Sequence, residues 1–290
     1  MKKLLPLLTP LALASCTPPA PKQDADPALW MVKDADTTIY LFGTVHALKP
    51  GLGWFDDAVR GAFDKSDSLV LELVLPPDDA MQGIVQELGA NDAPLSGQLP
   101  PETAMKLHDA LARAGKPADA LDGSEAWLAA IQIAAMPARA VGYDPKDGAE
   151  AVLTAAAGKA GKPVTGLETA REQFGYFDHL SPGAQQALLA QTLDELPDAE
   201  ARLDGIVAAW GRGDVDAIAA LLNKDLARSP ELERALLIRR NQHWADWIAA
   251  RMKAPGTVFV AVGAGHLAGP HGLQGDLIRR GMRVFRVRYS

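Results

Sequence analysis

Two apolar segments near opposite ends of the chain are each followed directly by the pattern Gly-x-x-His. The segment at 38–42 leads into Gly43-Thr44-Val45-His46, and the segment at 257–262 leads into Gly263-Ala264-Gly265-His266. Both segments have the length and the β-branched or aromatic content of buried strands. Strands that run parallel in one sheet present their carboxyl ends at the same edge. The repeat therefore predicts that the first and last thirds of the chain meet in one sheet and bring two imidazoles together.

Further apolar segments predict the rest of this sheet. Residues 29–33 are separated from the strand before the first motif by Asp34-Ala35-Asp36, which indicates a hairpin. The nearly continuous apolar run at 68–74 is typical of a strand covered on both faces. Short strands are also expected at 162–166 and 283–287.

The middle of the chain has helical periodicity and is rich in Ala and Leu. We expect a helix at about 54–65, a long helix at 231–252 and several helices between them. The predicted fold class is α/β: a mixed central sheet built from N- and C-terminal segments, with a large helical insert at about 78–252.

The first residues have the layout of a secretory signal. Lys2 and Lys3 precede an apolar run at 4–14, and small residues lead to Cys16. The run is about 11 residues, shorter than the roughly 20 that a membrane-spanning helix needs. The pattern resembles a lipobox, so we predict a signal peptide at 1–15 and acylation of Cys16. The acylated Cys16 is expected to attach the chain to the lipid bilayer.

The alternative, a buried N-terminal helix, is disfavoured by Pro6 and Pro10. Cys16 is the sole cysteine, so an intramolecular disulfide is excluded. Residues 16–27 are predicted to be a lipidated tether. Thr17 favours sorting to the outer membrane, facing the periplasm, because an Asp at this position resembles an inner-membrane retention signal.

Charge and length limit the class of partner. Removal of residues 1–15 reduces the 29 basic residues to 27, against 36 acidic ones, and gives a formal charge of −9. This charge disfavours nucleic acid as a partner. The remaining residues, 28–290, are expected to form one α/β domain, and the sequence leaves its oligomeric state open.

Four residues in these segments, two histidines and two glutamates, carry candidate chemistry. His46 and His266 are candidate metal ligands because imidazole binds several divalent metals; taken singly, each has the alternative of a hydrogen-bonded core or turn histidine. Glu72 lies inside the apolar strand, where a carboxylate is costly unless paired or metal-bound. Its alternative is an outward-facing side chain. Glu168 follows the strand at 162–166 and is expected to open a helix, where it has the alternative of a carboxylate near the helix dipole.

Arg240 and Asn241 are further candidates, late in the predicted helix at 231–252. Their alternative is a solvated helix face or a favourable interaction with the helix dipole. Of the remaining histidines, His271 is the nearest in sequence to the second motif. The chain lacks a phosphate-binding loop, a Gly-x-Ser-x-Gly motif, a His-Glu-x-x-His motif and a cysteine nucleophile.

Taken together, these motifs resemble the TraB/PrgY/GumN family and, through it, the TIKI-type metalloproteases. The matching pieces are Leu41–His46, the Glu72 strand, Gly161–Thr169, Arg240-Asn241, Val262–Gly269, Gly272-Leu273 and Leu277. The resemblance implies a fold akin to the erythromycin esterase and ChaN-like group, with a site centred on the two motif histidines and a glutamate. It also implies a divalent-metal-dependent peptidase, with Mn or Co favoured over Zn.

From residues and resemblance together we predict a metal-dependent hydrolase. His46, Glu72 and His266 are the predicted metal ligands. Glu168 is the candidate general base or orienting residue, and Arg240 and Asn241 are candidates for stabilising the oxyanion or holding the substrate. The expected substrate is a peptide, and the helical insert is expected to determine substrate specificity. Two alternatives stay open: a lipoprotein that binds and sequesters peptides without turnover, and an iron- or haem-handling lipoprotein, which the six scattered histidines do not favour.

Overall fold

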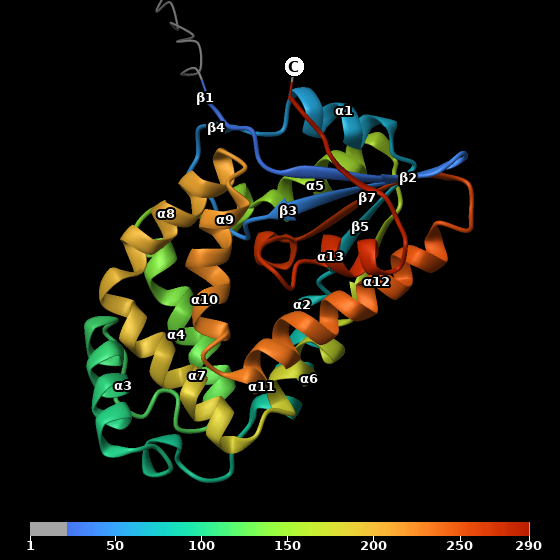
Figure 1. Cartoon of the computed structure of the whole chain (residues 1–290). Coiled ribbons are helices and arrows are strands. Elements are labelled where there is room, and N and C mark those ends of the chain that lie inside the picture. Colours follow the sequence, from blue (N-terminus) through green and yellow to red (C-terminus); the bar gives the residue numbers. More distant parts are fainter. Residues whose placement is uncertain (1–21, 290) are drawn as a thin grey trace, which may run out of the picture.

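The fold, obtained as a computed structural model that describes residues 22–289, is built on a six-stranded mixed sheet (Figure 1). The strand order is β6-β5-β7-β3-β2-β8. The strands are β2 (Leu29–Lys33), β3 (Thr37–Thr44), β5 (Ser68–Leu73), β6 (Val164–Glu168), β7 (Gly256–Gly263) and β8 (Val284–Arg286). The first four in this order run parallel, whereas β2 and β8 are antiparallel to their neighbours.

The two segments that precede the Gly-x-x-His motifs are neighbours. Strands β3 and β7 pair in parallel along their whole length, from Thr37 opposite Gly256 to Thr44 opposite Gly263. This confirms the predicted α/β class and the assembly of the sheet from both ends of the chain. The hairpin of β2 and β3 is confirmed as well.

Successive side chains of the central strands point to opposite faces of the sheet. Helices cover both faces and bury these side chains. On one face, Phe42 and Phe259 pack with residues of α1 (Asp57–Lys65), α5 (Ala149–Ala160) and α8 (Ala199–Gly211). On the other face, Leu41 and Val260 pack with α12 (Arg239–Arg251) and α13 (Leu273–Arg279). The sheet is therefore the middle of three layers.

Most of the remaining helices form a separate part beside the sheet, in the lower half of Figure 1. Its core lies between α3 (Pro101–Arg113), α4 (Ala126–Ala140) and α7 (Pro182–Glu195). The other helices are α2 (Asp78–Gly89), α6 (Ala170–Asp178), α9 (Val215–Ile218), α10 (Lys224–Leu226) and α11 (Pro230–Glu233), with two π-helical segments, η4 (Ala219–Asn223) and η5 (Arg234–Ile238), and short 3₁₀ turns at Leu95–Gly97, Pro145–Asp147, Leu196–Asp198 and Ala264–Leu267. In sequence, β6 interrupts the predicted insert and returns to the sheet.

Three local predictions need correction. The helix expected at 54–65 begins at Asp57, because Trp54 is buried against Phe42 and Trp210 before the helix starts. The long helix expected at 231–252 contains the π-helical segment η5. Glu168 is the last residue of strand β6 and does not open a helix, since Thr169 is the N-cap of α6.

The predicted signal peptide at 1–15 and Cys16 lie outside the described residues. Of the predicted tether at 16–27, the described residues pack on the domain: β1 (Gln23–Asp24) pairs with β4 (Leu52–Gly53), and Ala25 is buried. Across residues 22–289, no helix has the length and apolar content needed to span a membrane.

Candidate polar site at the carboxyl edge of the sheet

Four of the predicted site residues lie at the carboxyl ends of four adjacent parallel strands. His46 follows β3, Glu72 lies near the end of β5, Glu168 ends β6, and His266 lies in the 3₁₀ turn after β7. Open α/β sheets bind ligands at this edge. The fold thus collects residues that are far apart in sequence into one place.

The first and second motifs touch each other through their backbones. A Cβ at Gly43 would lie 3.1 Å from the Cα of Ala264, so a larger residue would push the two motifs apart. The carbonyl oxygen of Gly43 also accepts a hydrogen bond of 2.7 Å from the indole of Trp210. Glycine in the first motif is explained by this close approach.

Arg240, at the start of α12, connects the two glutamates. Its Nε donates to both carboxylate oxygens of Glu168 at 2.9 and 3.2 Å, and its Nη2 donates to Glu168 at 2.8 Å and to Glu72. The indole of Trp244 donates to Glu168 at 3.0 Å. The side chains of Arg240, Glu72 and Glu168 are 7 %, 12 % and 1 % exposed, respectively. The site therefore contains a buried cation shared between two buried carboxylates.

Glu72 has two further partners. Its Oε2 accepts from the backbone N–H of Gly263 at 3.1 Å, and its Oε1 accepts from the side-chain amide of Gln173 at 2.6 Å. Burial opposes ionisation of this carboxyl. The positive charges of His266 (when protonated), Arg240 and His46 outweigh burial and lower the pKa of Glu72 to about 2. Glu72 is therefore a carboxylate at neutral pH.

The pKa values of Glu168 and Arg240 are shifted in directions that burial and ion pairing explain. Burial raises the pKa of Glu168, against the lowering effect of Arg240. For Arg240, burial favours the neutral form, but the carboxylates of Glu72 and Glu168 raise its pKa, so the guanidinium stays charged. Buried ion pairs of this kind hold each other in place, because removal of one member leaves the other charge unpaired.

His266 is held in one tautomer by Asn241. The side-chain amide nitrogen of Asn241 donates to the carbonyl oxygens of His266 and His271, at 3.2 and 2.7 Å, so its oxygen faces the imidazole. The Nδ1–H of His266 therefore donates to that oxygen, at 2.8 Å. Its Nε2 then carries the lone pair and lies 3.1 Å from Nη1 of Arg240. Burial lowers the pKa of His266 to about 3, so the ring is neutral at neutral pH.

His46 differs from His266 because its side chain is 76 % exposed. Its Nδ1 lies 2.6 Å from a carboxylate oxygen of Glu150, in the first turn of α5. The hydrogen bond to Glu150 raises the pKa of His46 to about 9. Gly148 lets α5 approach this loop, since a Cβ at Gly148 would lie 2.1 Å from the carbonyl oxygen of His46.

Three residues of the site were not predicted from the sequence: Glu150, Gln173 and Trp244. Glu150 and Gln173 lie in the first turns of α5 and α6, where polar residues are common and mark no site by themselves. Trp244 lies four residues after Arg240 and therefore on the same face of α12. That spacing is the one signal that could have pointed to a partner of the buried network.

The donors present suit a divalent cation in their chemistry, although a cation would have to displace the proton of His46, whose pKa is about 9. His46 and His266 both use Nδ1 for a hydrogen bond to a side-chain oxygen, which leaves Nε2 as the ligand atom, the arrangement usual for metal-bound imidazoles. Two imidazoles with a carboxylate form a common donor set. Among the described residues no three His, Cys, Asp or Glu side chains are grouped closely enough to hold an ion. Arg240 lies between Glu72 and His266, and a cation at His266 has to displace its Nη1.

The fold and this edge define a three-layer α/β protein with a charged His-Glu-Arg site at the carboxyl ends of its parallel strands. The chain belongs to the TraB/PrgY/gumN family, whose sequence model matches residues 28–286. No curated protein and no solved structure matches the chain.

Proposed function

We propose that this chain is a divalent-metal-dependent hydrolase of peptide-like substrates, with His46, Glu72 and His266 as the metal ligands. The observation that carries the proposal is that these three residues lie at the carboxyl ends of β3, β5 and β7, which are neighbours in the sheet. The strand ends lie far apart in sequence, so only the fold brings them together. The family resemblance supports Mn or Co over Zn.

A bound divalent ion supplies Lewis acidity: it polarises a substrate carbonyl and makes water more acidic. The chain's own residues hold the donors. Glu150 orients His46 through Nδ1, and Asn241 orients His266 in the same way. Arg240 keeps Glu72 ionised and fixes its direction.

The buried network gives three of the predicted residues positioning roles. Glu168 is 1 % exposed and bonded to Arg240 and Trp244, which supports an orienting role over that of a general base. The polar atoms of Asn241 all have backbone or imidazole partners, so this residue positions His266 and does not hold the substrate. Arg240 likewise acts through Glu72 and His266.

A second candidate mechanism, hydrolysis without a metal, is favoured by the pair of His46 and Glu150. An exposed imidazole oriented by a partly buried carboxylate is the arrangement of a general base that activates water. Because the pKa of His46 is about 9, its ring is protonated at neutral pH, and this mechanism operates at alkaline pH. In this mechanism Arg240 stays between Glu72 and His266. Activity then survives chelation but not the loss of His46.

We also propose a location in the cell for this chain and a relationship of its fold to other proteins. An acylated Cys16 would place the domain at the outer membrane, facing the periplasm. A relationship to the erythromycin esterase and ChaN-like group belongs to the same proposal, supported by the mixed sheet with its polar carboxyl edge.

The test is cleavage of a mixed peptide library by the purified mature chain, read by mass spectrometry. The chain is first treated with chelator and then supplied with Mn, Co or Zn. We expect cleavage that chelation abolishes and Mn or Co restores, and that His46→Ala and His266→Ala both lose. Cleavage that survives chelation selects the metal-free mechanism.

Two outcomes would contradict hydrolysis. Peptide binding without any cleavage, retained after chelation and in His46→Ala, indicates a sequestering lipoprotein. Bound iron or a haem absorption band in the purified protein indicates an iron- or haem-handling one.

A further inference from the structure

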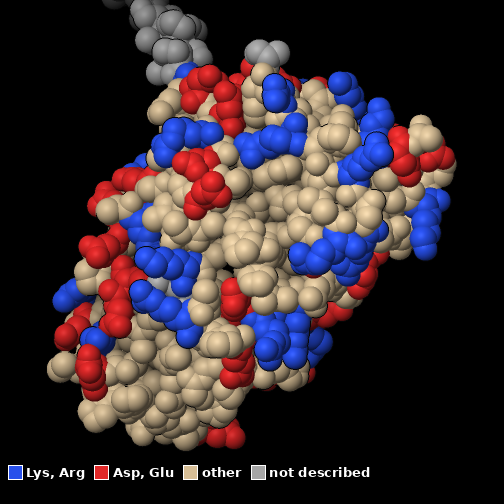
Figure 2. All heavy atoms as spheres, viewed as in Figure 1, with Lys and Arg blue, Asp and Glu red and all other residues tan. Residues whose placement is uncertain are grey.

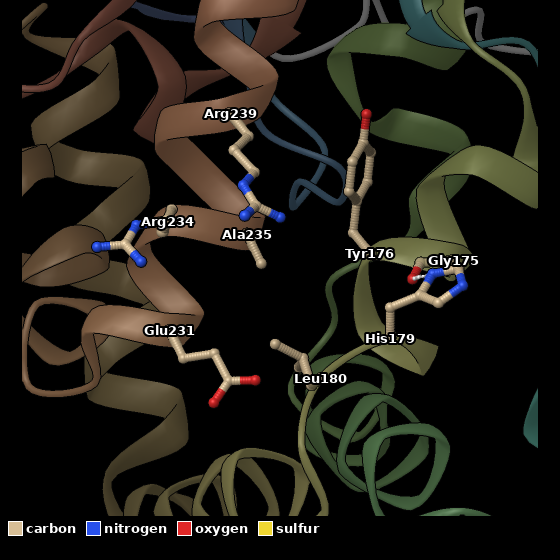
Figure 3. Close-up of a pocket in the computed structure, with 8 residues that line it drawn as sticks. All are labelled: Gly175, Tyr176, His179, Leu180, Glu231, Arg234, Ala235 and Arg239. Carbon is tan, nitrogen blue, oxygen red and sulfur yellow. Dashed lines mark hydrogen bonds between the residues drawn. The ribbon is translucent and has the colours of Figure 1, made fainter.

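A pocket of about 500 Å³ lies beside the polar site, between α6 and the stretch that runs through α11, η5 and the start of α12 (Figure 3). Its lining residues are Gly175, Tyr176, His179, Leu180, Glu231, Arg234, Ala235 and Arg239. The volume is in the range of pockets that bind small ligands or short peptide segments.

Two arginines give the pocket a positive side. The backbone N–H of Arg239 donates to the carbonyl oxygen of Arg234, the five-residue step of a π-helix. In an α-helix, residues five apart point about 140° away from each other, whereas the wider π turn lets both line one pocket. Figure 3 shows Arg239 facing Tyr176, with the guanidinium of Arg234 directed away from that ring.

Neither arginine is neutralised within the described part of the chain, where no carboxylate lies within ion-pairing distance of Arg234 or Arg239. The one acid in the lining, Glu231, is committed to Ser181, whose backbone N–H and hydroxyl both bond it at 2.7 Å. Arg239 therefore has a free guanidinium at the wall of a pocket.

The rest of the wall is largely apolar. Leu180 is buried and contributes to a small hydrophobic cluster, and Ala235 packs against the same cluster. The ring of Tyr176 forms the side opposite Arg239 (Figure 3). A ligand that suits this pocket has an apolar stem and a single anionic group.

The pocket adjoins the polar site through two elements. Arg240 follows Arg239 in α12, and the guanidinium carbon of Arg240 lies 5.6 Å from the ring centroid of Tyr176. On α6, Gln173 bonds Glu72, one turn before Tyr176. The ring of Tyr176 is thus shared between the pocket and the buried Arg240 network.

We propose that this pocket binds the C-terminal carboxylate of a peptide substrate, with Arg239 as the main anion-binding residue, so that cleavage occurs near the C-terminus. This inference rests on the proposed hydrolase function. In the reaction, water adds across the amide C–N bond: its hydroxyl joins the carbonyl carbon, and its proton goes to the departing amine. A carboxylate is favoured over a doubly charged phosphate because the two arginines and Glu231 leave the lining with one net positive charge.

The first experiment compares N-acetylated tripeptides that end in Ala, Leu or Phe, each made as the free acid and as the amide. We expect kcat/KM to be about tenfold or more higher for the acids, because a hydrogen bond to a charged group is lost in the amides. Arg239→Gln should remove this preference. The matched control is Arg113→Gln, the same change at an exposed position on α3, outside the pocket. Equal rates for acid and amide would overturn the inference.

The second experiment separates the pocket from the reaction. Binding of the same peptides to the His46→Ala chain is followed by isothermal titration calorimetry, with no turnover required. We expect the acids to bind about tenfold or more tightly than the amides, and Arg239→Gln, but not Arg113→Gln, to abolish the difference. If no peptide is cleaved but this preference is present, the hydrolase proposal fails and the carboxylate pocket stands. If cleavage occurs without the preference, the pocket proposal fails alone.

Discussion

Arg240 is the residue that contacts most of the other members of the polar site. It holds Glu72 and Glu168 together and touches the Nε2 of His266. Its neighbour Arg239 has the same chemistry but is exposed. The two adjacent arginines therefore offer a direct comparison of a buried, shared charge with a surface one.

We predict that Arg240→Met lowers the free energy of unfolding by about 3–5 kcal/mol, because two buried carboxylates lose their counter-ion. Arg239→Gln should change it by no more than about 0.5 kcal/mol. Urea unfolding followed by tryptophan fluorescence measures both. Equal stability of the two variants would contradict the role given to Arg240.

The pH at which His46 titrates should depend on Glu150. Since the hydrogen bond to Glu150 raises the pKa of His46 to about 9, removal of that carboxylate must lower it. In Glu150→Gln we expect the His46 titration to move down towards the ordinary value of about 6.5. NMR of the histidine ring protons measures the change, and the exposed His108 of α3 serves as an internal control. An unchanged midpoint for His46 would show that Glu150 is not its partner in solution.

Among the elements, the strands could be predicted from the sequence, whereas the geometry of the site could be predicted only in part. Apolar runs followed by Gly-x-x-His placed β3 and β7 together, because strand composition and the sheet edge follow general rules. The π-helical segment η5 has no such signal, so the expected helix at 231–252 placed Arg240 and Asn241 on an ordinary helical face. Glu150 was missed because its contact with His46 joins residues 104 positions apart.

The N-terminus of α5 is the element that positions the loop of His46. Ala149 donates its backbone N–H to the carbonyl oxygen of Val45 at 3.0 Å, and Gly148 lies against the carbonyl of His46. We predict that Gly148→Ala displaces this loop, costs about 1–3 kcal/mol of stability and lowers hydrolysis. Peptide cleavage and urea unfolding are the measurements.

The control lies in the same helix. Gly158 of α5 has open space where a Cβ would be, so Gly158→Ala should stabilise the helix by up to about 1 kcal/mol and leave hydrolysis unchanged. If Gly148→Ala behaves like Gly158→Ala, the close approach of α5 does not position His46.

At the scale of the whole molecule, the packed chain begins at β1, at the end of the molecule where the C-terminus also lies, and the helices α3, α4 and α7 lie at the opposite end (Figure 1). On the face shown in Figure 2, acidic and basic side chains are interspersed, and uncharged residues cover the middle. An anchor that precedes β1 would therefore hold the domain with its helical part away from the bilayer.

The predicted lipid anchor at Cys16 is tested in cells that process lipoproteins. Cys16→Ser should abolish labelling with a fatty-acid probe and move the protein from the membrane to the soluble fraction, since acyl chains supply the membrane affinity. Thr17→Ala, one residue later, should keep both labelling and membrane attachment. Membrane retention of Cys16→Ser would show another means of attachment.

Whether His46, Glu72 and His266 form one metal site is decided by the metal content of the purified chain. Mass-spectrometric metal analysis should find about one divalent ion per chain in the wild type and in the control variant His108→Ala. His46→Ala and His266→Ala should each lose it. Unchanged metal content in both of these variants would contradict the shared site.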